Sequence, residues 1–222
     1  MVVDTVKYPL TNDDYPKTLL IGSLFVVGSV FILPLFVLIG FFARAISNAI
    51  NGEPAPQFSA YGELFVDGLK LTAISVVYLL GLVVLAALTS LLASISEVAG
   101  FVGMLVTALY YFGFIYLSTA IIYQFCRRGQ LRDAFDLRAI GDTAYSLQYF
   151  LVVLLWLFVL PTLFAVGQVL LAVTLIGILL IPATLIYELV VYAKLIGDLP
   201  GPADTSVDGG TDTVGTTGQR AE

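Results

Sequence analysis

Long runs of apolar residues, separated by short polar connectors, constrain this chain more than any other feature of its sequence. The longest run covers residues 147–195 with very little charge, and three others cover residues 18–42, 69–93 and 101–125. An α-helix rises about 1.5 Å per residue, so a helix of about 25 residues is longer than the roughly 30 Å hydrocarbon core of a bilayer. Because lipid excludes ionised side chains, these runs predict membrane-spanning helices.

The composition excludes an ordinary soluble core. The chain of 222 residues is 59% hydrophobic and 12% charged, whereas soluble domains are about half apolar and a quarter charged. We therefore expect an all-α fold, a polytopic transmembrane helical bundle of about five spans with short interfacial amphipathic helices. The acidic polar fraction, with a net charge of −6, is typical of salt-loving archaea.

The same pattern predicts three regions. Residues 1–17 form a polar N-terminal segment, residues 18–196 the transmembrane domain, and residues 197–222 a disordered acidic tail with little to bury. The run 147–195 is too long for one helix, and a turn near Gly167 and Gln168 would divide it. The expected spans are residues 18–42, 69–93, 101–125, 147–167 and 169–195.

Prolines interrupt three of these spans. Pro34 lies in the middle of the first, where it removes one backbone hydrogen bond, and Pro161 and Pro182 lie in the last two. We expect kinks there, because neighbouring groups in a bundle can satisfy the freed carbonyls. The alternative at Pro34 is a re-entrant turn, which would place the N-terminus on the cytoplasmic side.

The polar connectors predict two interfacial helices. Apolar residues recur at helical spacing over residues 58–69 and again over 130–140, with charged residues on the other faces. Arg127, Arg128 and Arg132 begin the second connector and are candidate contacts for anionic lipid headgroups. Neighbouring aspartates neutralise most of this positive charge, which excludes a nucleic-acid partner.

The basic residues also predict an orientation. With five spans, every Lys and Arg except Lys7 and Lys17 lies on the side of the connectors 43–68 and 126–146 and of the C-terminus. Short cytoplasmic loops are enriched in basic residues. We therefore expect a multi-pass protein of the plasma membrane with its N-terminus outside and its C-terminal tail in the cytoplasm.

Few polar side chains lie inside the spans. Glu188 is the one acid there, so it is a candidate functional residue, although it could instead reach the headgroups or pair with Lys194 or Lys70. Tyr110 and Tyr111 lie at mid-depth, where they could line a polar cavity or form hydrogen bonds across the bundle.

Small residues recur along the second span. Ala86, Ser90 and Ser94 follow one another at steps of four and place small side chains on one helix face. Such a face allows two membrane helices to approach closely. We expect this strip to form a packing seam.

The sequence contains few of the residues that catalysis or metal binding requires. The chain has no histidine and one cysteine, Cys126, so the common zinc sites and His-based catalytic sets are excluded. We also find no nucleophile motif and no phosphate-binding glycine loop. We expect neither an enzyme nor a bound cofactor or metal.

Residues 15–22, the helix exit at 40–44 and the connector at 52–69 resemble a family of uncharacterised multi-pass membrane proteins of archaea, especially haloarchaea, and of bacteria. Members carry a lysine, an apolar run that ends in glycine, a basic exit, and then a proline–aromatic, acidic–glycine connector. The resemblance implies a fold and a membrane location but no catalytic residues, since the family is a domain of unknown function. It implies structural signature positions at Gly22, Arg44, Pro56, Asp67 and Gly68.

Two classes of function stay open. A structural or accessory component that binds other membrane proteins, lipid or further copies of itself needs only the small-residue strip and the interfacial helices. A transporter or channel for a small solute or lipid needs polar groups at mid-depth, and the spans supply few of these. The first class agrees better with the residues present.

Overall fold

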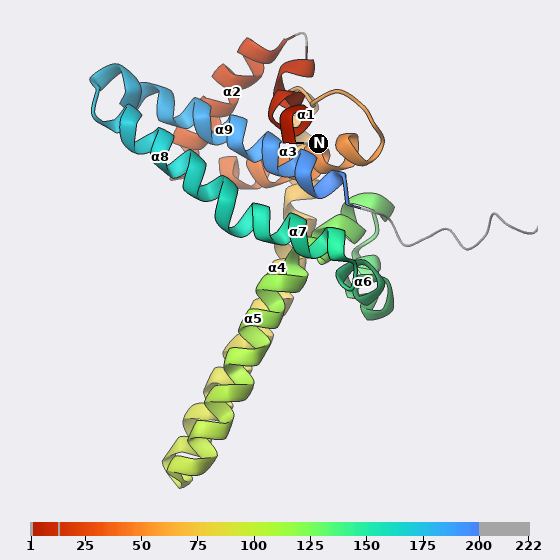
Figure 1. Ribbon diagram of the computed structural model, residues 1–222, viewed down its shortest axis with the longest axis vertical. Coiled ribbons are helices and arrows are strands. Elements are labelled where there is room, and N and C mark those ends of the chain that lie inside the picture. The colour runs from red at the N-terminus through yellow and green to blue at the C-terminus, as the bar shows by residue number, and fades with distance from the viewer. Residues whose placement is uncertain (1, 13, 200–222) are drawn as a thin grey trace, which may run out of the picture.

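The computed structural model describes residues 2–12 and 14–199, and the regular elements of these residues are all helical (Figure 1). Five helices are long and apolar enough to cross a membrane, which confirms the predicted all-α fold with about five spans. They are Ile32–Ile50, Tyr61–Ile95, Glu97–Arg128, Leu147–Ala172 and Ile176–Gly197. Most of the predicted disordered tail lies outside the described residues.

The first apolar run is divided into two helices, α2 (Tyr15–Gly28) and α3 (Ile32–Ile50). The backbone becomes extended at Phe31, with φ −89° and ψ 132°, and Pro34 lies in the first turn of α3. A proline is tolerated there because the first amides of a helix have no partner within it. The expectation of one helix over residues 18–42, kinked at Pro34, is therefore wrong: the chain breaks before the proline.

Helices α2 and α3 form a hairpin. The ring of Phe58, from the following connector, stacks on Phe25 of α2 at 5.5 Å between centroids and on Phe41 of α3 at 4.0 Å. In one continuous helix, Phe25 and Phe41 would be about 24 Å apart. A single ring could not then contact both, so the chain reverses direction between the two helices.

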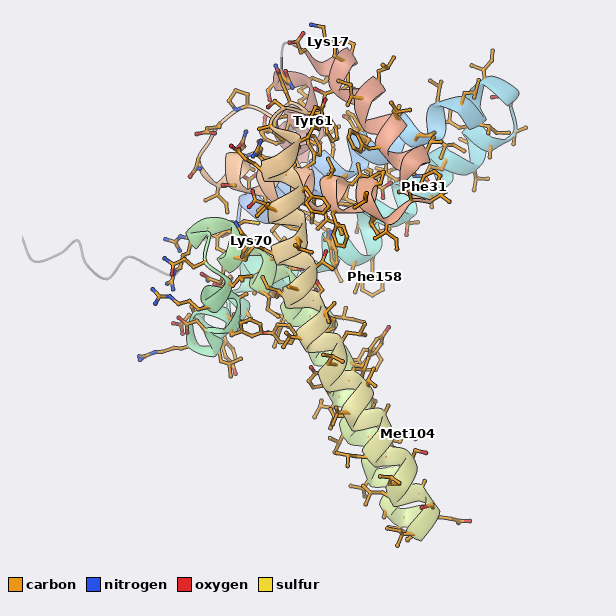
Figure 2. All side chains as sticks on the ribbon, turned by 180° about the vertical axis from the view of Figure 1, so that it is seen from behind. Lys17, Phe31, Tyr61, Lys70, Met104 and Phe158 are labelled. Atoms are coloured by element: carbon orange, nitrogen blue, oxygen red, sulfur yellow. The ribbon has the colours of Figure 1, made fainter. Side chains whose placement is uncertain are left out.

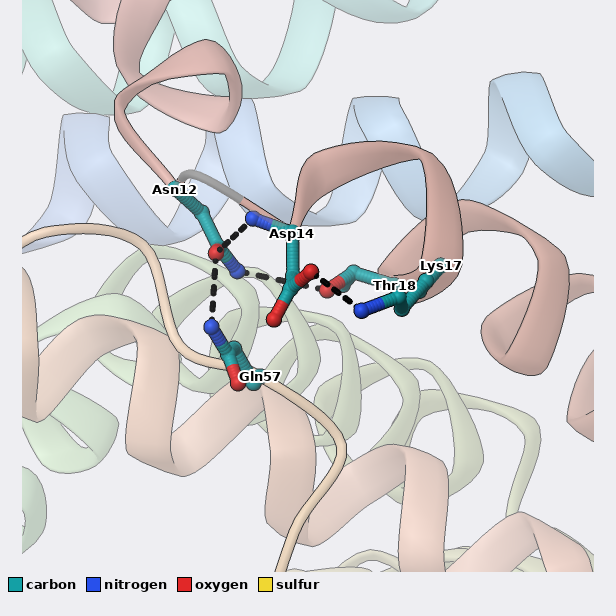
Figure 3. A network of polar contacts seen from close by, with 5 residues as sticks. All are labelled: Asn12, Asp14, Lys17, Thr18 and Gln57. Atoms are coloured by element: carbon teal, nitrogen blue, oxygen red, sulfur yellow. Dashed lines mark hydrogen bonds and ion pairs between the residues drawn. The ribbon is translucent and has the colours of Figure 1, made fainter.

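A network of polar contacts joins the N-terminal segment to the connector after α3 (Figure 3). Asn12 donates through Nδ2 to Thr18 Oγ1 and to the carbonyl of Pro56, both over 3.2 Å. Gln57 donates in turn to Asn12 Oδ1 over 3.0 Å. Asn12 is buried, so these bonds compensate for the loss of water at its amide.

The N-terminal helices α1 (Val2–Lys7) and η1 (Tyr8–Thr11) also contact the end of α9 (Leu175–Gly197). The Tyr8 hydroxyl donates to the carbonyl of Glu53 over 3.1 Å, and Lys194 Nζ lies 5.4 Å from the centroid of the Tyr8 ring. The N-terminal segment therefore lies beside the end of α9. This arrangement agrees with the alternative of a re-entrant turn at Pro34, and the orientation of the two ends relative to a membrane stays a prediction.

Helix α4 (Tyr61–Ile95) contains both the predicted interfacial helix and the second span. It begins directly after Ala60, whose left-handed backbone (φ 52°) ends the extended connector. The apolar pattern over residues 58–69 thus belongs to the first turns of a 35-residue helix and not to a separate helix in the headgroup plane. Its 35 residues reach about 52 Å, well beyond the hydrocarbon core.

Helices α4 and α5 (Glu97–Arg128) form a second hairpin that extends as a rod away from the other helices (Figure 1). Thr89 and Thr107 share a hydrogen bond of 2.8 Å across it, and Gly100 and Gly103 allow close approach to Ala93 and Thr89. The predicted strip at Ala86, Ser90 and Ser94 is exposed, so it does not form the seam of this hairpin.

The arginine-rich connector forms two short helices, η2 (Leu131–Phe135) and α6 (Leu137–Ala144), instead of the single helix predicted over residues 130–140. Asp136 separates them, because its carboxylate accepts from the amide of Ala139 and caps α6. Gln124 of α5, fully buried, fixes α6 by donating to the carbonyl of Ala139 over 3.2 Å and to Thr143 Oγ1 over 2.9 Å.

The third hairpin consists of α7 (Leu147–Leu154), the π-helical segment η3 (Leu155–Val159) and α8 (Leu160–Ala172), followed by α9. The turn lies at Val173 and Thr174, not at Gly167 and Gln168 as predicted. Thr174 accepts from the amide of Gly177 over 2.9 Å and so caps α9. The fourth span begins at residue 147 as expected and ends five residues later, the fifth begins seven residues later and ends two residues later, and Pro182 lies inside α9.

The polar ends of the three hairpins meet in one region, which we call the base. It comprises the N-terminal segment to residue 18, the connectors 51–60 and 129–146, and the end of α9 from residue 192 with the adjoining helix turns. Every Lys and Arg of the described residues lies there, including Lys17 and Lys70 (Figure 2). The opposite ends, at residues 29–31, 95–97 and 173–174, hold Glu97 as their charged residue.

Candidate functional site

Glu188 lies in the second half of α9, and both oxygens of its carboxyl group accept hydrogen bonds. Gln168 of α8 donates through Nε2 to Oε2 over 3.0 Å, and Tyr192 donates through its hydroxyl to Oε1 over 2.6 Å. The two partners come from the two helices of one hairpin. The carboxyl group is therefore held in a defined position rather than left to move in an apolar surrounding.

The lysines considered as partners for Glu188 are paired elsewhere. Lys194 forms an ion pair with Asp198 one turn further along α9, and Lys70 pairs with Asp67 at 2.9 Å. The expectation that Glu188 pairs with one of these lysines is wrong. Neutral donors hold Glu188 instead, so the acid does not simply serve as half of an ion pair.

A cavity of about 520 Å³ adjoins Glu188, between the α2–α3 hairpin and the α8–α9 hairpin. We call it the Glu188 cavity. Apolar side chains from α2, α3, η3, α8 and α9 form most of its walls. Glu188 and Tyr192 are the lining residues with polar side-chain groups, apart from the indole of Trp156. Ligand sites in proteins commonly have 300–1,000 Å³, mostly apolar walls and a few placed polar groups. The cavity has these properties.

The opening of the Glu188 cavity is apolar. Leu35, Leu157 and Leu185 line it and are themselves 42%, 38% and 37% exposed. These exposed lining residues come from α3, η3 and α9. A molecule that enters here passes leucine side chains, which favours an apolar chain over a hydrated solute.

The π-helical segment η3 contributes Trp156 and Leu157 to the wall of the Glu188 cavity. Pro161 has no amide to donate to the carbonyl of Leu157, and its ring would crowd that carbonyl in a regular α-helix. A single π turn accommodates such a conflict and often occurs at functional sites. Trp156, on the same turn, packs edge-on against Tyr192 with 6.4 Å between ring centroids, and both rings line the cavity.

Tyr110 and Tyr111, the other candidates from the sequence, lie in the α4–α5 hairpin and away from the Glu188 cavity. Tyr110 donates to the carbonyl of Tyr78 over 2.8 Å, across the point where Gly81 leaves room for its hydroxyl. Tyr111 is 46% exposed on the outside of the hairpin. The structure does not bring the three candidates together, and the contact of Tyr110 is a structural hydrogen bond between helices.

The candidate headgroup arginines lie at the base. Arg128 forms an ion pair of 3.5 Å with Asp136, and Arg132 is an exposed residue of η2. Arg127 is partly buried, and its Nη1 has no hydrogen-bond partner among the described residues. Because this Nη1 atom is itself buried, it does not reach a headgroup in this structure, and the assignment of the three arginines to anionic headgroups stays a prediction.

Both signature glycines, Gly22 and Gly68, lie where helices almost touch, and so does Gly40, which is not a signature position. A Cβ on Gly68 of α4 would lie 1.8 Å from the carbonyl oxygen of Phe36, and one on Gly40 of α3 would lie 1.7 Å from that of Leu64. These two glycines therefore face one another where α3 and α4 cross. A Cβ on Gly22 would lie 2.7 Å from Ile186 of α9, which makes Gly22 the contact point of α2 with α9.

The polar signature residues build the base. Arg44 pairs with Glu63 at 2.9 Å and so connects α3 to the first turn of α4. The carbonyl of Pro56 accepts from Asn12, and Asp67 pairs with Lys70. Each of these residues has a contact within the structure, and their assignment as signature positions of the family stays a prediction.

Sequence reasoning missed Gln168 as the partner of Glu188, because it placed this residue in a turn. The signal was present: Thr174 is a good N-cap residue and could have marked the turn six residues later. With the turn at Thr174, Gln168 and Glu188 become the polar residues of two adjacent antiparallel helices.

A family described as "Protein of unknown function (DUF4013)" matches residues 23–181 of the chain. The match includes parts of all three hairpins, so it extends well beyond the residues that carry the resemblance, which end at residue 69. Gln168 lies within the matched residues and Glu188 lies beyond them. No curated protein and no solved structure matches the chain.

Proposed function

The chain belongs to the family of proteins of unknown function described above, and from its structure we propose that it is an accessory membrane component that binds a lipid or lipid-like amphiphile in the Glu188 cavity. The observation that carries this proposal is the position of the cavity. It is apolar, opens between exposed leucines, and holds one fixed carboxyl group.

The distribution of polarity supports a location in the membrane. In the most apolar window of α4, and likewise of α5, only 11% of the residues are buried inside the protein. Such a surface is stable in contact with lipid or with the apolar face of another membrane protein, and not with water. We place the protein in the plasma membrane, as the expected multi-pass protein.

The basic residues support an orientation with the base in the cytoplasm. All Lys and Arg of the described residues lie at the base, and the turns of the three hairpins contain none. By the tendency of basic residues to remain on the cytoplasmic side, the hairpins enter from the cytoplasm and return to it. This proposal puts the N-terminal segment and the end of α9 on the cytoplasmic side together.

An amphiphile fits the Glu188 cavity better than a small polar solute does. Its apolar chain would replace empty apolar space and gain dispersion contacts along α3 and α9. A carboxylate has about four acceptor positions, and Gln168 and Tyr192 use two of them. A hydroxyl or ammonium group on the ligand can bind at the remaining positions, which would orient the molecule.

The single tryptophan, Trp156, lines the cavity and provides a direct test. We would reconstitute the protein in vesicles of brominated phosphatidylcholine and measure quenching of Trp156 fluorescence. Leu185→Phe fills part of the cavity from α9, and we expect it to reduce the quenching by at least half. Leu179→Phe makes the same change at an exposed position of the same helix (76% exposed) and should quench like the wild type.

Equal quenching in the wild type and both variants would contradict the proposal, because lipid at the outer surface would then account for the signal. Loss of quenching in both variants would also contradict it, since a general change in the contact with lipid would be responsible. Melting temperatures in detergent would establish that the variants are folded.

A transporter is the second candidate, favoured by the presence of an acid inside a span. In that case the carboxyl group of Glu188 would couple solute or proton movement. Glu188→Gln keeps the size of the side chain and removes its charge, so it should abolish flux in reconstituted vesicles. Unchanged flux would remove Glu188 from any coupling role.

The accessory role also implies partners, either another membrane protein or a second copy of the chain. Crosslinking in native membranes followed by purification should recover a stoichiometric partner, and recovery of the uncrosslinked chain alone would argue for lipid as its only partner. We propose no catalysis, in keeping with a chain that has no histidine and a single cysteine.

A further inference from the structure

A second cavity, of about 280 Å³, lies in the base between α3, α4 and α5. We call it the base cavity. In contrast to the Glu188 cavity it has many polar groups on its walls, among them Ser47, Asn48, Asn51, Glu53 and Asp67. Neither the family description nor the proposed function assigns it a role.

The net charge that the base cavity presents is negative. Arg44 lines it, but its guanidinium pairs with Glu63 at 2.9 Å, and Asp67 pairs with Lys70 at 2.9 Å. These two pairs cancel. The carboxylate of Glu53 has no hydrogen-bond or ion-pair partner among the residues that the structure describes, so its charge remains available to a ligand.

Two helix C-termini adjoin the base cavity. Helix α3 ends at Ile50 and α5 ends at Arg128, and the last turns of both contribute residues to the cavity wall. The C-terminus of a helix carries a partial negative charge of about half an elementary charge. The last turn of α5 also contains Arg127 and Arg128, which offset this charge, whereas the last turn of α3 contains no basic residue, so the end of α3 is the one that favours a cation.

The uncharged side chains on the wall supply further acceptors. Asn48 donates through Nδ2 to the carbonyl of Pro54 over 2.9 Å, which leaves its Oδ1 as an acceptor. The Ser47 hydroxyl and the Asn51 side chain have no hydrogen-bond partner among the described residues. With Glu53, they form a set that suits a group with several N–H donors, and a primary ammonium has three.

We propose that the base cavity binds a small organic cation through a primary ammonium group, with Glu53 as its counter-ion and the oxygens of Ser47, Asn48 and Asn51 as further acceptors. An anion is disfavoured, because the guanidinium of Arg44 already has its partner. The ammonium group belongs to a soluble amine or to the headgroup of an aminophospholipid, since the base lies at the polar surface of the membrane.

Two binding measurements test this proposal and separate the two sources. Titration calorimetry of the purified protein with ethanolamine, in an amine-free buffer, measures the soluble amine. Native mass spectrometry with equal amounts of phosphatidylethanolamine and phosphatidylcholine measures the headgroup, because the two lipids differ in their ammonium N–H groups. Binding of ethanolamine without preference between the lipids indicates a soluble amine, and preference for phosphatidylethanolamine indicates a lipid.

Glu53→Gln keeps the shape of the side chain and removes its charge, so we expect it to weaken binding by about 10-fold or more, as for other hydrogen bonds to charged groups. Glu97→Gln makes the same change at the far end of the α4–α5 hairpin and should bind like the wild type. Asn51→Leu removes the side-chain amide oxygen, which is one of the proposed acceptors, and should also weaken binding.

The proposal is overturned if the wild type binds neither ethanolamine nor phosphatidylethanolamine, or if Glu53→Gln binds as tightly as the wild type. Leu185→Phe, which fills part of the Glu188 cavity, should leave this binding unchanged. A failure of the base cavity to bind amines is therefore distinguishable from a failure of the Glu188 cavity to bind lipid.

Discussion

Two glycine residues, Gly40 and Gly68, determine how closely helices α3 and α4 approach one another. Gly40 and Gly68 face one another where α3 crosses α4, and a Cβ at either position would lie less than 2 Å from a backbone carbonyl oxygen. Backbone atoms cannot move aside as the end of a flexible side chain can. The crossing therefore requires glycine at both positions, and it fixes the base from which the long hairpin extends.

We predict that Gly68→Ala destabilises the protein by about 1–3 kcal/mol or more, because the added methyl group forces α3 and α4 apart. Thermal unfolding in detergent measures this. Gly62→Ala is the matched control: no atom lies within 4 Å of its added Cβ, so the change should be neutral or stabilise α4 by up to about 1 kcal/mol. Equal melting temperatures for the two variants would argue against the close crossing.

A residue-scale prediction also concerns pH. Burial raises the pKa of the Tyr8 phenol above its ordinary value of about 10, and the carboxylates of Asp198 and Glu53 raise it further. The neutral phenol is therefore favoured in the folded protein. Its contribution to stability is complete below pH 10 and decreases as the pH rises from there through the raised pKa.

Tyr8→Phe removes both this titration and the hydrogen bond to Glu53, at a cost of about 1 kcal/mol. The difference in melting temperature between wild type and variant should be constant from about pH 6 to 9 and should shrink above about pH 10. A difference that stayed constant up to about pH 12 would show that the phenol titrates alike in both states.

At the scale of elements, the α2–α3 hairpin decides the topology. Pro34 cannot continue a helix that includes Val30, so the chain breaks at residues 29–31 and α3 begins anew. Phe58 then fills the angle between the two helices by stacking on both. The break alone would permit either a kinked crossing or a reversal, and this aromatic contact selects the reversal.

Spin labels at Leu20 and Ser47, in a background with Cys126 replaced by Ala, test the hairpin. In one continuous helix the two positions would be separated by about 40 Å. Because α2 and α3 lie side by side, we predict a clearly shorter distance by pulsed electron resonance. Labels at Leu20 and Val27, within α2, should be separated by about 10 Å in either arrangement and serve as the reference. A distance near 40 Å between Leu20 and Ser47 would contradict the hairpin and support one continuous helix through the first apolar run.

At the scale of the whole molecule, three hairpins meet at a basic base (Figures 1 and 2). The N-terminal segment and the end of α9 then lie together, as the contact of Tyr8 with Lys194 requires. The positive-inside tendency acts on all the basic residues at once, without Lys7 and Lys17 as exceptions.

We predict that an impermeant maleimide added to intact cells labels Ser96→Cys, at the turn of the α4–α5 hairpin, and does not label Asp4→Cys or Arg132→Cys. After the cells are opened, the last two should react. Each variant carries Cys126→Ala to remove the native thiol. Labelling of Asp4→Cys from outside would separate the two ends of the chain and contradict the hairpin topology.

The sequence by itself determined the class of the fold and most of the helical runs. Apolar runs of this length have a stable arrangement as helices in lipid, and this follows from hydrogen bonding and hydrophobicity without knowledge of neighbours. It also identified Glu188 as the polar residue of interest, because a lone acid in an apolar run is visible in one dimension.

Only the tertiary structure decided the direction of the first apolar run, the partner of Glu188 and the two cavities. Each depends on contacts between residues distant in the chain: Phe58 with Phe25 and Phe41, and Gln168 with Glu188. Local propensity specifies where a helix can start and end. It does not specify which surfaces then meet, since that depends on packing energies summed over the whole molecule.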